Sequence, residues 1–389
     1  MSGEKGIRVM NFPLKQQGTH MSINTGKSIS RNTEILNVVT HALLFVAAWA
    51  VFNRHQVFGL AVALHGVLIL FTAVTSAVMA HMLFYLFFDW VDKKEFPSFK
   101  VQLQSVMKRT WSGTPIVTAL ILGLAVHPGI ALYVIGITVF FAEILAKLLF
   151  GGYGQNIFNP VAFGLVFILL AFGATEMMAG HLPDAVTAAT PLVGLSQVNW
   201  MMDSQEIQRF MTDQGGFLNM LLGLVPGSFG ETARLASLLA LAYMIYKKVL
   251  DWAIPLFYLG TIFVITLVYG FSIGAGWWYP FVHLLTGGIV YGSIFMITDP
   301  VTSPINRQGK AIFAILLAMF TLLIRLNTPH PEGVAFAILL MNMFVPFIDA
   351  KTANVTLVDT HKKITSVGIT FVVALVVVIG FTSLIHFFG

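Results

Sequence analysis

The stretch GIALYVIGITVFFAEILAKLL, residues 129–149, decides the fold class of this chain. It remains apolar over about the 20 residues that an α-helix needs to cross a membrane. Further stretches of the same character lie on both sides of it, at residues 35–52, 57–88, 114–127, 157–174, 235–250, 253–271, 283–298, 311–325, 332–349 and 364–388. The sequence therefore predicts an all-α polytopic membrane protein with eleven crossing segments.

The composition excludes the main alternatives. Hydrophobic residues make up 57% of the 389 residues and charged residues only 10%, whereas a soluble domain carries about 25% charge. A soluble multidomain enzyme and a disordered chain are both excluded. A β-barrel would show short alternating segments instead of long apolar runs. Because the chain has no cysteine, it cannot form disulfides, thiolate metal sites or an iron–sulfur cluster held by this chain alone.

The basic residues predict the orientation. With the N-terminus in the cytoplasm, all but four of the 22 Lys and Arg residues fall on the cytoplasmic side, as the positive-inside rule requires. The exceptions are Arg54, Arg209, Arg234 and Arg325. The net charge of +5 is therefore attributed to cytoplasmic loops, and we expect no nucleic-acid partner.

This orientation divides the chain into three parts. Residues 1–34 form a polar cytoplasmic segment without the apolar core of a cleavable signal peptide. Residues 35–349 form the membrane domain, and residues 350–389 form a linker and an extra helix that ends outside. A long extracytoplasmic loop is predicted at 175–234, with an interfacial helix at 216–224.

Three of the predicted spans have unusual lengths. The stretch 57–88 is too long for one perpendicular helix, so it must tilt, protrude or break. The stretches 114–127 and 283–298 are short and run into prolines. Short or broken helices at membrane depth need protein or water around their free backbone groups.

The predicted outside loop contains DAVTAAT, residues 184–190. It fits the flavinylation pattern Asp-x-x-[Ser/Thr]-x-Ala-Thr, in which the last threonine receives FMN through a phosphodiester. Thr190 is then the acceptor, with Asp184, Thr187 and Ala189 as pattern residues. The small neighbours would let a flavin transferase reach the hydroxyl. The alternative is an ordinary small-residue turn before a proline.

A glycine-rich string, GGYGQNIFNP, occupies residues 151–160. Gly151, Gly152 and Gly154 permit tight turns and the close approach of a flat ligand, while Asn156 and Asn159 offer polar contacts. The string is not the dinucleotide-binding GxGxxG motif and no βαβ unit surrounds it. A loop that merely lets two helices pack closely explains it equally well.

Acidic side chains near span ends are candidates for an ion path. Asp299 lies in ITDPVTSP, residues 297–304, whose prolines and hydroxyls suggest a broken helix. Asp349 ends the span at 332–349, where a capping or orienting role is favoured. Within that span, Asn342 is expected to bond a neighbouring helix. No catalytic set and no metal site is predicted.

Glu143 is the third candidate for the ion path. It lies four residues before Lys147, so the two can pair on one helix face. A structural pair is favoured over a proton relay. Histidines near or within spans, namely His41, His65, His81 and His283, could in principle ligate haem, but packing roles are favoured because no paired spacing repeats.

Five short strings, taken in chain order, resemble those of RnfD, a membrane component of the Rnf electron-transport complex. They also resemble those of its homologue NqrB, from the sodium-pumping NADH:quinone oxidoreductase (Nqr). The resemblance covers roughly residues 113–349. It rests on FGGYGQN with the following Asn159-Pro160, on residues 184–192, on GET at 230–232, on TDPV at 298–301, and on GVAFA at 333–337 up to Asp349.

The resemblance implies a component of a bacterial inner-membrane complex that couples ferredoxin–NAD electron transfer to Na⁺ or H⁺ transport. It also implies a ten-helix core, to which the segment 364–388 adds an extra C-terminal helix. The further implications are covalent FMN on Thr190, a second riboflavin-type flavin, and partner subunits that hold the iron–sulfur centres. Such a component belongs to a translocating oxidoreductase and is not catalytic alone. The rivals are the quinone-reducing Nqr component and, from another class, a channel or transporter without redox chemistry.

Overall fold

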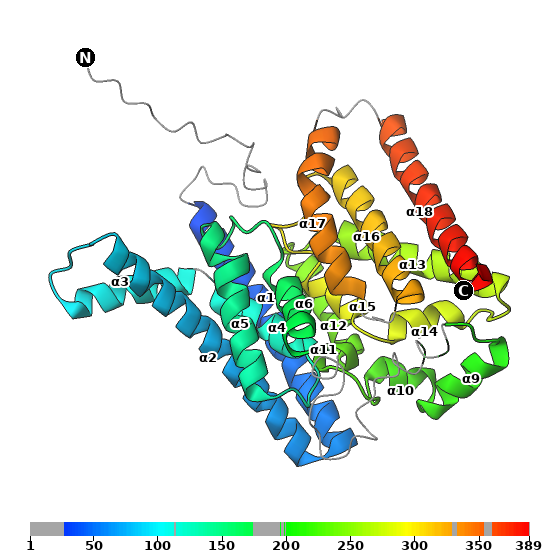
Figure 1. Cartoon of the computed structure of the whole chain (residues 1–389), viewed down its shortest axis with the longest axis horizontal. Helices are drawn as coiled ribbons and strands as arrows, with labels where there is room; N and C mark the ends of the chain where they lie inside the picture. The colour runs from blue at the N-terminus through cyan, green and yellow to red at the C-terminus, as the bar shows by residue number, and fades with distance from the viewer. Residues whose placement is uncertain are drawn as a thin grey trace.

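The computed structural model consists of helices, turns and loops over the residues that it describes, which are 27–112, 114–173, 195, 198, 200–328, 333–353 and 360–388 (Figure 1). Seven helices are long and apolar enough to cross a membrane. They are α1 (Lys27–Phe58), α2 (Leu60–Val91), α5 (Leu132–Ala146, continued by the 3₁₀ turn η2, Leu148–Phe150), α13 (Ala253–Ser272), α16 (Arg307–Asn327), α17 (Gly333–Thr352) and α18 (Thr360–Phe388). The prediction of an all-α polytopic membrane protein is confirmed.

Shorter apolar helices account for the remaining predicted spans. They are α4 (Pro115–Ala125), α6 (Pro160–Phe172) and α12 (Arg234–Tyr246), together with the pair α14 (Tyr279–Leu285) and α15 (Ile289–Phe295). At 1.5 Å per residue, α4 is only about 16 Å long, roughly half the hydrocarbon thickness. The expectation of short and broken helices is therefore confirmed.

The break in the span predicted at 283–298 lies earlier than the prolines suggested. The helix begins at Tyr279, and Thr286 is extended between α14 and α15. Gly287 follows with a φ of 70°, which a residue with a side chain rarely adopts. The turn of Asp299 and Pro300 comes after the second half-helix instead of interrupting it.

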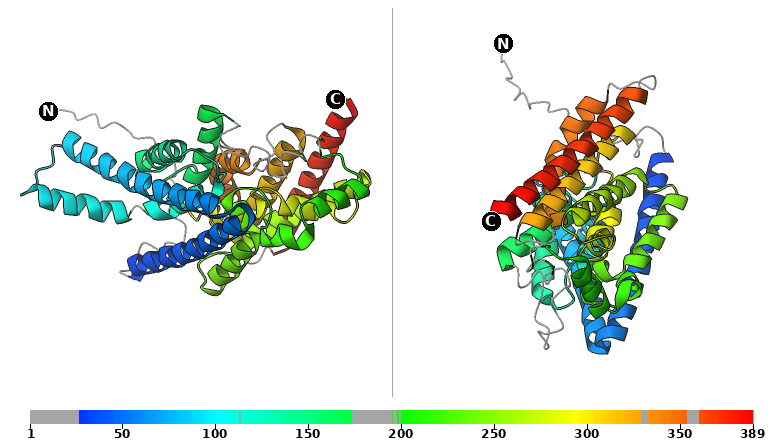
Figure 2. Two further views of the ribbon diagram at one scale, coloured as in Figure 1. Left: turned by 90° about the horizontal axis from the view of Figure 1, so that it is seen from below. Right: turned by 90° about the vertical axis from the view of Figure 1, so that its right-hand side faces the viewer.

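The long stretch predicted at 57–88 forms one unbroken helix, α2. Its 32 residues correspond to about 48 Å, so it exceeds the membrane core by more than half. The excess projects from the bundle and packs against α3 (Phe99–Ser112), as Figure 2 shows. Within the bundle, α2 buries a stripe of small residues that allows close helix approach: Ala63, Gly66, Ala73, Ala77 and Ala80.

The described part of the segment 175–234 contains three short helices. These are α9 (Ser204–Asp213), α10 (Gly216–Leu222) and α11 (Phe229–Thr232). Helix α10 confirms the helix predicted at 216–224, and its Leu218 side chain is 63% exposed, consistent with a surface-lying element. Residues 174–194, which carry the DAVTAAT string, lie outside the described residues.

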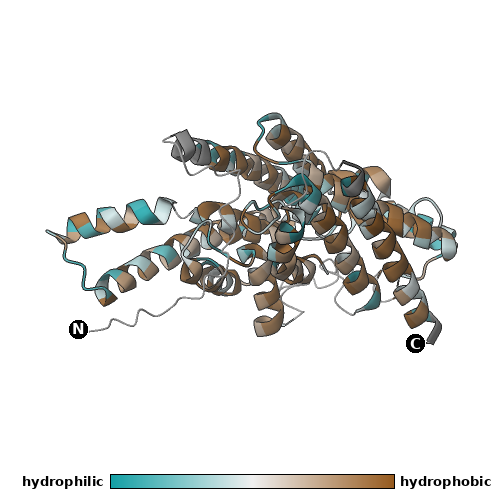
Figure 3. Cartoon of the chain, turned by 90° about the horizontal axis from the view of Figure 1, so that it is seen from above, coloured by the Kyte–Doolittle hydropathy of each residue, from teal (hydrophilic) through white to brown (hydrophobic). Residues whose placement is uncertain are grey.

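Helix α18 confirms the extra C-terminal helix. It packs mainly on α16 and also contacts α13. Ala374 and Val378 are buried in this contact, and Asn327 of α16 donates to the Thr382 hydroxyl at 3.1 Å. Most of its remaining surface is apolar and exposed, as the hydropathy colours of Figure 3 indicate for the long helices in general. Such a surface suits contact with lipid.

Candidate functional site

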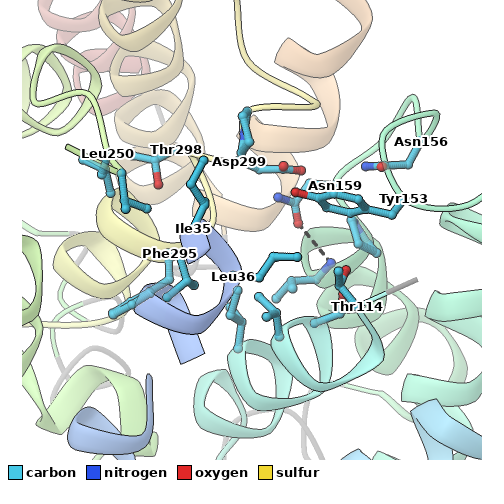
Figure 4. Close-up of a pocket in the computed structure, with 18 of the residues that line it drawn as sticks. Ile35, Leu36, Thr114, Tyr153, Asn156, Asn159, Leu250, Phe295, Thr298 and Asp299 are labelled. Atoms are coloured by element: carbon cyan, nitrogen blue, oxygen red, sulfur yellow. Dashed lines mark hydrogen bonds between the residues drawn. The ribbon is translucent and has the colours of Figure 1, made fainter. Parts of the chain in front are cut away.

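One pocket lies where α1, α4, α6, α12 and α15 converge, and its volume is about 130 Å³. Its polar lining comes from Thr114, Thr118, Lys147, Tyr153, Asn156, Asn159, Thr298 and Asp299, several of which Figure 4 labels. Its apolar wall includes Ile35, Leu36, Val39, Val117, Ile121, Met244, Val249, Leu250, Ile294 and Phe295. The pocket therefore combines an apolar slot with a polar end.

The glycine string forms a tight turn at the edge of this pocket. Gly151, Gly152 and Gly154 have φ values of 111°, 91° and 91°, so a side chain at any of them would strain the backbone. This turn places Tyr153 and Asn156 in the pocket wall (Figure 4). Burial raises the pKa of the Tyr153 hydroxyl, and the charge of Asp299 raises it further. Tyr153 therefore stays a hydrogen-bond donor at physiological pH.

Asn159 holds the pocket together through all of its polar atoms. Its side-chain oxygen accepts from the N–H groups of Val161 and Ala162 at 3.0 and 3.1 Å, which caps the start of α6. Its Nδ2 donates to the carbonyl of Met296 at 2.9 Å. Its backbone N–H donates to Oδ1 of Asn342 at 2.9 Å. These bonds assign Asn159 a positioning role.

Asn342 connects α17 to two segments, because its Nδ2 also donates to the carbonyl of Thr302 at 3.0 Å. The expectation that Asn342 bonds neighbouring elements is confirmed. Asp349 on the same helix accepts from the N–H of Ile305 at 2.9 Å, which is the orienting role predicted for it. Asp349 does not line the pocket.

Asp299 lines the pocket and also organises the turn after α15. Its two carboxylate oxygens accept from the N–H of Val301 at 3.1 Å and from the Thr302 hydroxyl at 3.0 Å. The carboxylate thus satisfies two donors of the turn that follows α15. The structure places Asp299, Asn156 and Asn159 around one pocket and leaves Asp349 on the neighbouring segment.

Lys147 reaches the pocket from the end of α5, although the sequence placed it with the cytoplasmic loop residues. Its ammonium lies 3.1 Å from Oε2 of Glu143, which confirms the predicted pair, and it donates to Oγ1 of Thr118 at 3.1 Å. Oε2 of Glu143 also lies 2.8 Å from Nε2 of His81. All three charged or titratable side chains are at most 2% exposed. A single pair predicted from spacing is therefore part of a buried triad.

Two of the other membrane histidines, His65 and His283, serve as packing residues in the described structure. His65 Nε2 lies 3.0 Å from the carbonyl of Ile130, and the His283 ring stacks on Trp200 with centroids 4.6 Å apart. These contacts agree with the packing interpretation. Thr190, Asp184, Thr187 and Ala189 lie outside the described residues.

Sequence reasoning missed several residues of the pocket. Tyr153 was passed over inside the glycine string, and Thr118 and the apolar side chains of α1 and α12 carried no signal. An apolar side chain that lines a pocket does not differ in sequence from one that faces lipid. Only the polar positions could have been found from the sequence.

Comparison with known proteins identifies the family. The profile of the NQR2, RnfD, RnfE family matches residues 19–357. The D component of the proton-translocating ferredoxin:NAD(+) oxidoreductase complex of Clostridium ljungdahlii is 37% identical over 247 residues, covering 62% of this chain and 74% of the relative. The D component of the Na(+)-translocating ferredoxin:NAD(+) oxidoreductase complex of Acetobacterium woodii is 35% identical over 54% of this chain and 62% of the relative.

The second branch that the sequence resembled is also represented. The B component of the Na(+)-translocating NADH-quinone reductase of Chromohalobacter salexigens is 33% identical over 60% of this chain and 56% of the relative. The matched profile ends before α18, so this helix lies beyond it. The chain belongs to the NQR2, RnfD, RnfE family.

Proposed function

We propose that this chain is the membrane-embedded, electron-carrying component of an Rnf-type complex, which couples electron transfer between ferredoxin and NAD to the transport of H⁺ or Na⁺. The carrying observation is the family match over residues 19–357, supported by relatives that are named as the D components of such complexes. In this function the chain acts with other membrane and peripheral subunits in the bacterial cytoplasmic membrane. The membrane helices and the buried polar site suit this function.

Thr190 is the proposed attachment point of covalent FMN. A residue before proline is biased towards an extended backbone, so the sequence Thr190-Pro191 favours presentation of the hydroxyl to a flavin transferase. In-gel flavin fluorescence of the denatured chain, co-expressed with a flavin transferase, tests this directly. Thr190→Val should abolish the signal, whereas Thr187→Val should keep at least part of it and Asp299→Asn all of it. A fluorescent Thr190→Val chain would contradict the assignment.

The pocket is the proposed site of a second, riboflavin-type flavin. A flat ring system of this kind needs apolar walls, which Leu36 and Phe295 help to form, and polar groups at one edge, which Lys147, Tyr153 and Asn156 provide. When bound, a flavin supplies one- and two-electron redox chemistry. The ammonium of Lys147 would stabilise negative charge in the pocket, and the Tyr153 hydroxyl would donate a hydrogen bond.

A pocket-filling variant tests the second flavin. Leu36→Trp adds bulk to the apolar wall without touching the polar network, and Leu44→Trp changes the same residue type on the same helix where the side chain is 51% exposed. Acid extraction of the purified Thr190→Val chain should release riboflavin. The release should fall with Leu36→Trp and persist with Leu44→Trp. Extracts without flavin from the parent chain would rule out this use of the pocket.

The quinone-reducing Nqr component is the second candidate, favoured by the similarity to the relative from Chromohalobacter salexigens. The two candidates differ in the electron acceptor. Membranes that contain the assembled complex should reduce NAD with reduced ferredoxin if the complex is of Rnf type. NADH-dependent reduction of a quinone without ferredoxin activity would favour the Nqr type. The relatives' oxidoreductase names argue against a plain channel or transporter.

Asp299, Asp349 and Glu143 remain the proposed ion-path residues. Asp299 has the strongest support because it lines the pocket. Ion uptake into vesicles that contain the complex, compared between wild type and Asp299→Asn, tests its role. Uptake at the wild-type rate would remove Asp299 from the path.

A further inference from the structure

A ladder of polar side chains runs along one face of α2 and continues on α5. His81, Tyr85 and Asp89 follow one another at intervals of four residues, so they share a helix face. Glu143 and Lys147 have the same spacing on α5, which packs along α2. The ladder extends from the elbow between α2 and α3 to the pocket, because Lys147 lines the pocket.

The ladder is wetter at one end than at the other. Arg109 of α3 forms an ion pair with Asp89 and lies over the Tyr85 ring at 4.9 Å, and its side chain is 30% exposed. The Tyr85 ring stands edge-on to the His81 ring, with centroids 6.1 Å apart. Beyond His81, the side chains of Glu143 and Lys147 are at most 2% exposed. The elbow is therefore the end of the ladder that meets water.

His81 is the member of the ladder that is suited to change its charge. With a neutral imidazole, the charges of Glu143 and Lys147 cancel. The Nε2 atom of His81 faces the Glu143 carboxylate, which favours an N–H at that position. The Nδ1 atom is buried and has no hydrogen-bond partner in the described structure. This vacant acceptor is where a second proton can bind.

Charge in the pocket would act on this position. Lys147 bridges the two sites, since it lines the pocket and lies 3.1 Å from Glu143. The pocket's other titratable groups are Asp299 and Tyr153, which is held protonated. A negative charge added there would attract the Lys147 ammonium toward the pocket and so weaken its contact with Glu143. The carboxylate would then favour a positively charged imidazole as its second partner.

We propose that His81 is a redox-linked proton acceptor, positioned by Glu143 and Lys147, that compensates negative charge gained in the pocket. When an external reductant delivers one electron to the pocket, one proton passes from water at the α2–α3 elbow to Nδ1 of His81. The proton returns to water when the electron leaves, so the net charge of pocket and triad is conserved. The proposal rests on the proposed function, because it requires a redox-active ligand in the pocket.

The test uses the full-length Thr190→Val chain, in which the releasable flavin is the only flavin to be titrated. Its midpoint potential is measured electrochemically between about pH 6 and pH 8, the range in which histidine ordinarily titrates. Loss of one proton per electron changes the pH dependence of the reduction equilibrium by about tenfold per pH unit. His81→Gln, which keeps a donor to Glu143 but does not titrate, should show this loss. His65→Gln, on the same helix but bonded to Ile130, should behave as the parent chain.

A second measurement needs no variant. Infrared difference spectra of the chain labelled with ¹³C-histidine, reduced minus oxidised, should show label-sensitive imidazole bands. An unchanged pH dependence in His81→Gln, or the absence of histidine bands, would overturn the proton role while leaving the flavin in place. Absence of any releasable flavin would instead overturn the proposed pocket function, and this proposal with it.

Discussion

Buried cations are held in opposite ways in two regions of the bundle. Next to the pocket, Lys147 pairs with a carboxylate, as does Lys310 with Asp251 at 2.9 Å. In the region of α10, α11 and α14, three buried arginines donate to backbone carbonyls instead. Arg54 binds the carbonyl of Gly227 at 2.8 Å, Arg325 binds that of His283 at 2.9 Å, and Arg234 binds that of Met220.

This difference explains the exceptions to the positive-inside pattern. Arg54, Arg234 and Arg325 are three of the four basic residues that fell on the predicted outer side, and each is at most 1% exposed. They satisfy carbonyls that short and broken helices leave free. Glu231 attracts Arg54 and Arg234 electrostatically, but their hydrogen bonds go to backbone carbonyls and, for Arg54, also to the Thr232 hydroxyl at 2.7 Å. Carbonyls take up no protons near neutral pH, so the bonds from these arginines to carbonyls do not depend on the protonation of their acceptors.

The contrast between the two regions assumes the predicted orientation of the chain in the membrane. A test of this orientation has an all-or-none outcome. A reporter fused after Gly389 should behave as extracytoplasmic, and one fused before the start of α1 as cytoplasmic, because the basic loops favour the inside. Paired alkaline phosphatase and fluorescent-protein fusions measure this. A cytoplasmic C-terminus would mean that the two regions lie on the opposite sides of the membrane from those predicted, or that α18 does not span the membrane.

Removal of Lys147 should have the largest effect on stability. Lys147→Met leaves Glu143 without its ammonium partner, and breaking a buried ion pair costs about 3–5 kcal/mol. Thermal unfolding in detergent, followed by size-exclusion chromatography, measures the loss. The double variant Lys147→Met with Glu143→Gln should recover much of it, because no unpaired charge remains. Failure of the second substitution to rescue would show that the pair is not the reason for the loss.

Removal of Arg325 should lower the stability of the fold by less than removal of Lys147 does. No Asp-to-Asn or Glu-to-Gln substitution should restore it. Arg325→Met removes the 2.9 Å bond to the carbonyl of His283, together with weaker 3.3 Å bonds to that of Thr286, and one unsatisfied buried carbonyl costs about 1–3 kcal/mol. Arg209→Met on α9, where the side chain is exposed, is the matched control and should leave the unfolding temperature unchanged. An equal fall in the unfolding temperature of Arg325→Met and Arg209→Met would contradict the role assigned to the carbonyl-bound arginines.

The pair of Asp251 and Lys310 should give the smallest effect. Burial raises the pKa of Asp251, but its bonds to Lys310 and to the N–H of Ala253 outweigh burial and hold the net pKa below its usual range. The carboxylate therefore stabilises the fold above the unfolded-state pKa of about 3.9, and this contribution is lost as the pH falls through the folded-state pKa. Asp251→Asn should be less stable than wild type from about pH 8 to pH 5, and the gap should narrow below about pH 4. A gap that widens on acidification would contradict the pairing.

The positions of the site motifs could be predicted, but their partners could not. The spacing of Glu143 and Lys147 predicted their pair, and the span ends predicted that Asp349 would orient a neighbour. His81 lies 62 positions from Glu143 in the chain, and Asn342 lies 183 positions from Asn159. These contacts exist because α2 packs on α5 and α17 packs on α6. No local sequence pattern predicts which helices pack together.

The sequence by itself determined the fold class, the crossing segments and the extra C-terminal helix, because the length of an apolar run is set against the thickness of a membrane. It also singled out the glycine turn, since few residues other than glycine tolerate the left-handed conformations that the turn requires. Only the tertiary structure decided where α14 and α15 separate, which apolar side chains line the pocket and which partners the buried charges have. Apolar residues facing lipid, core or pocket look alike in sequence, and a buried charge selects its partner through packing in three dimensions.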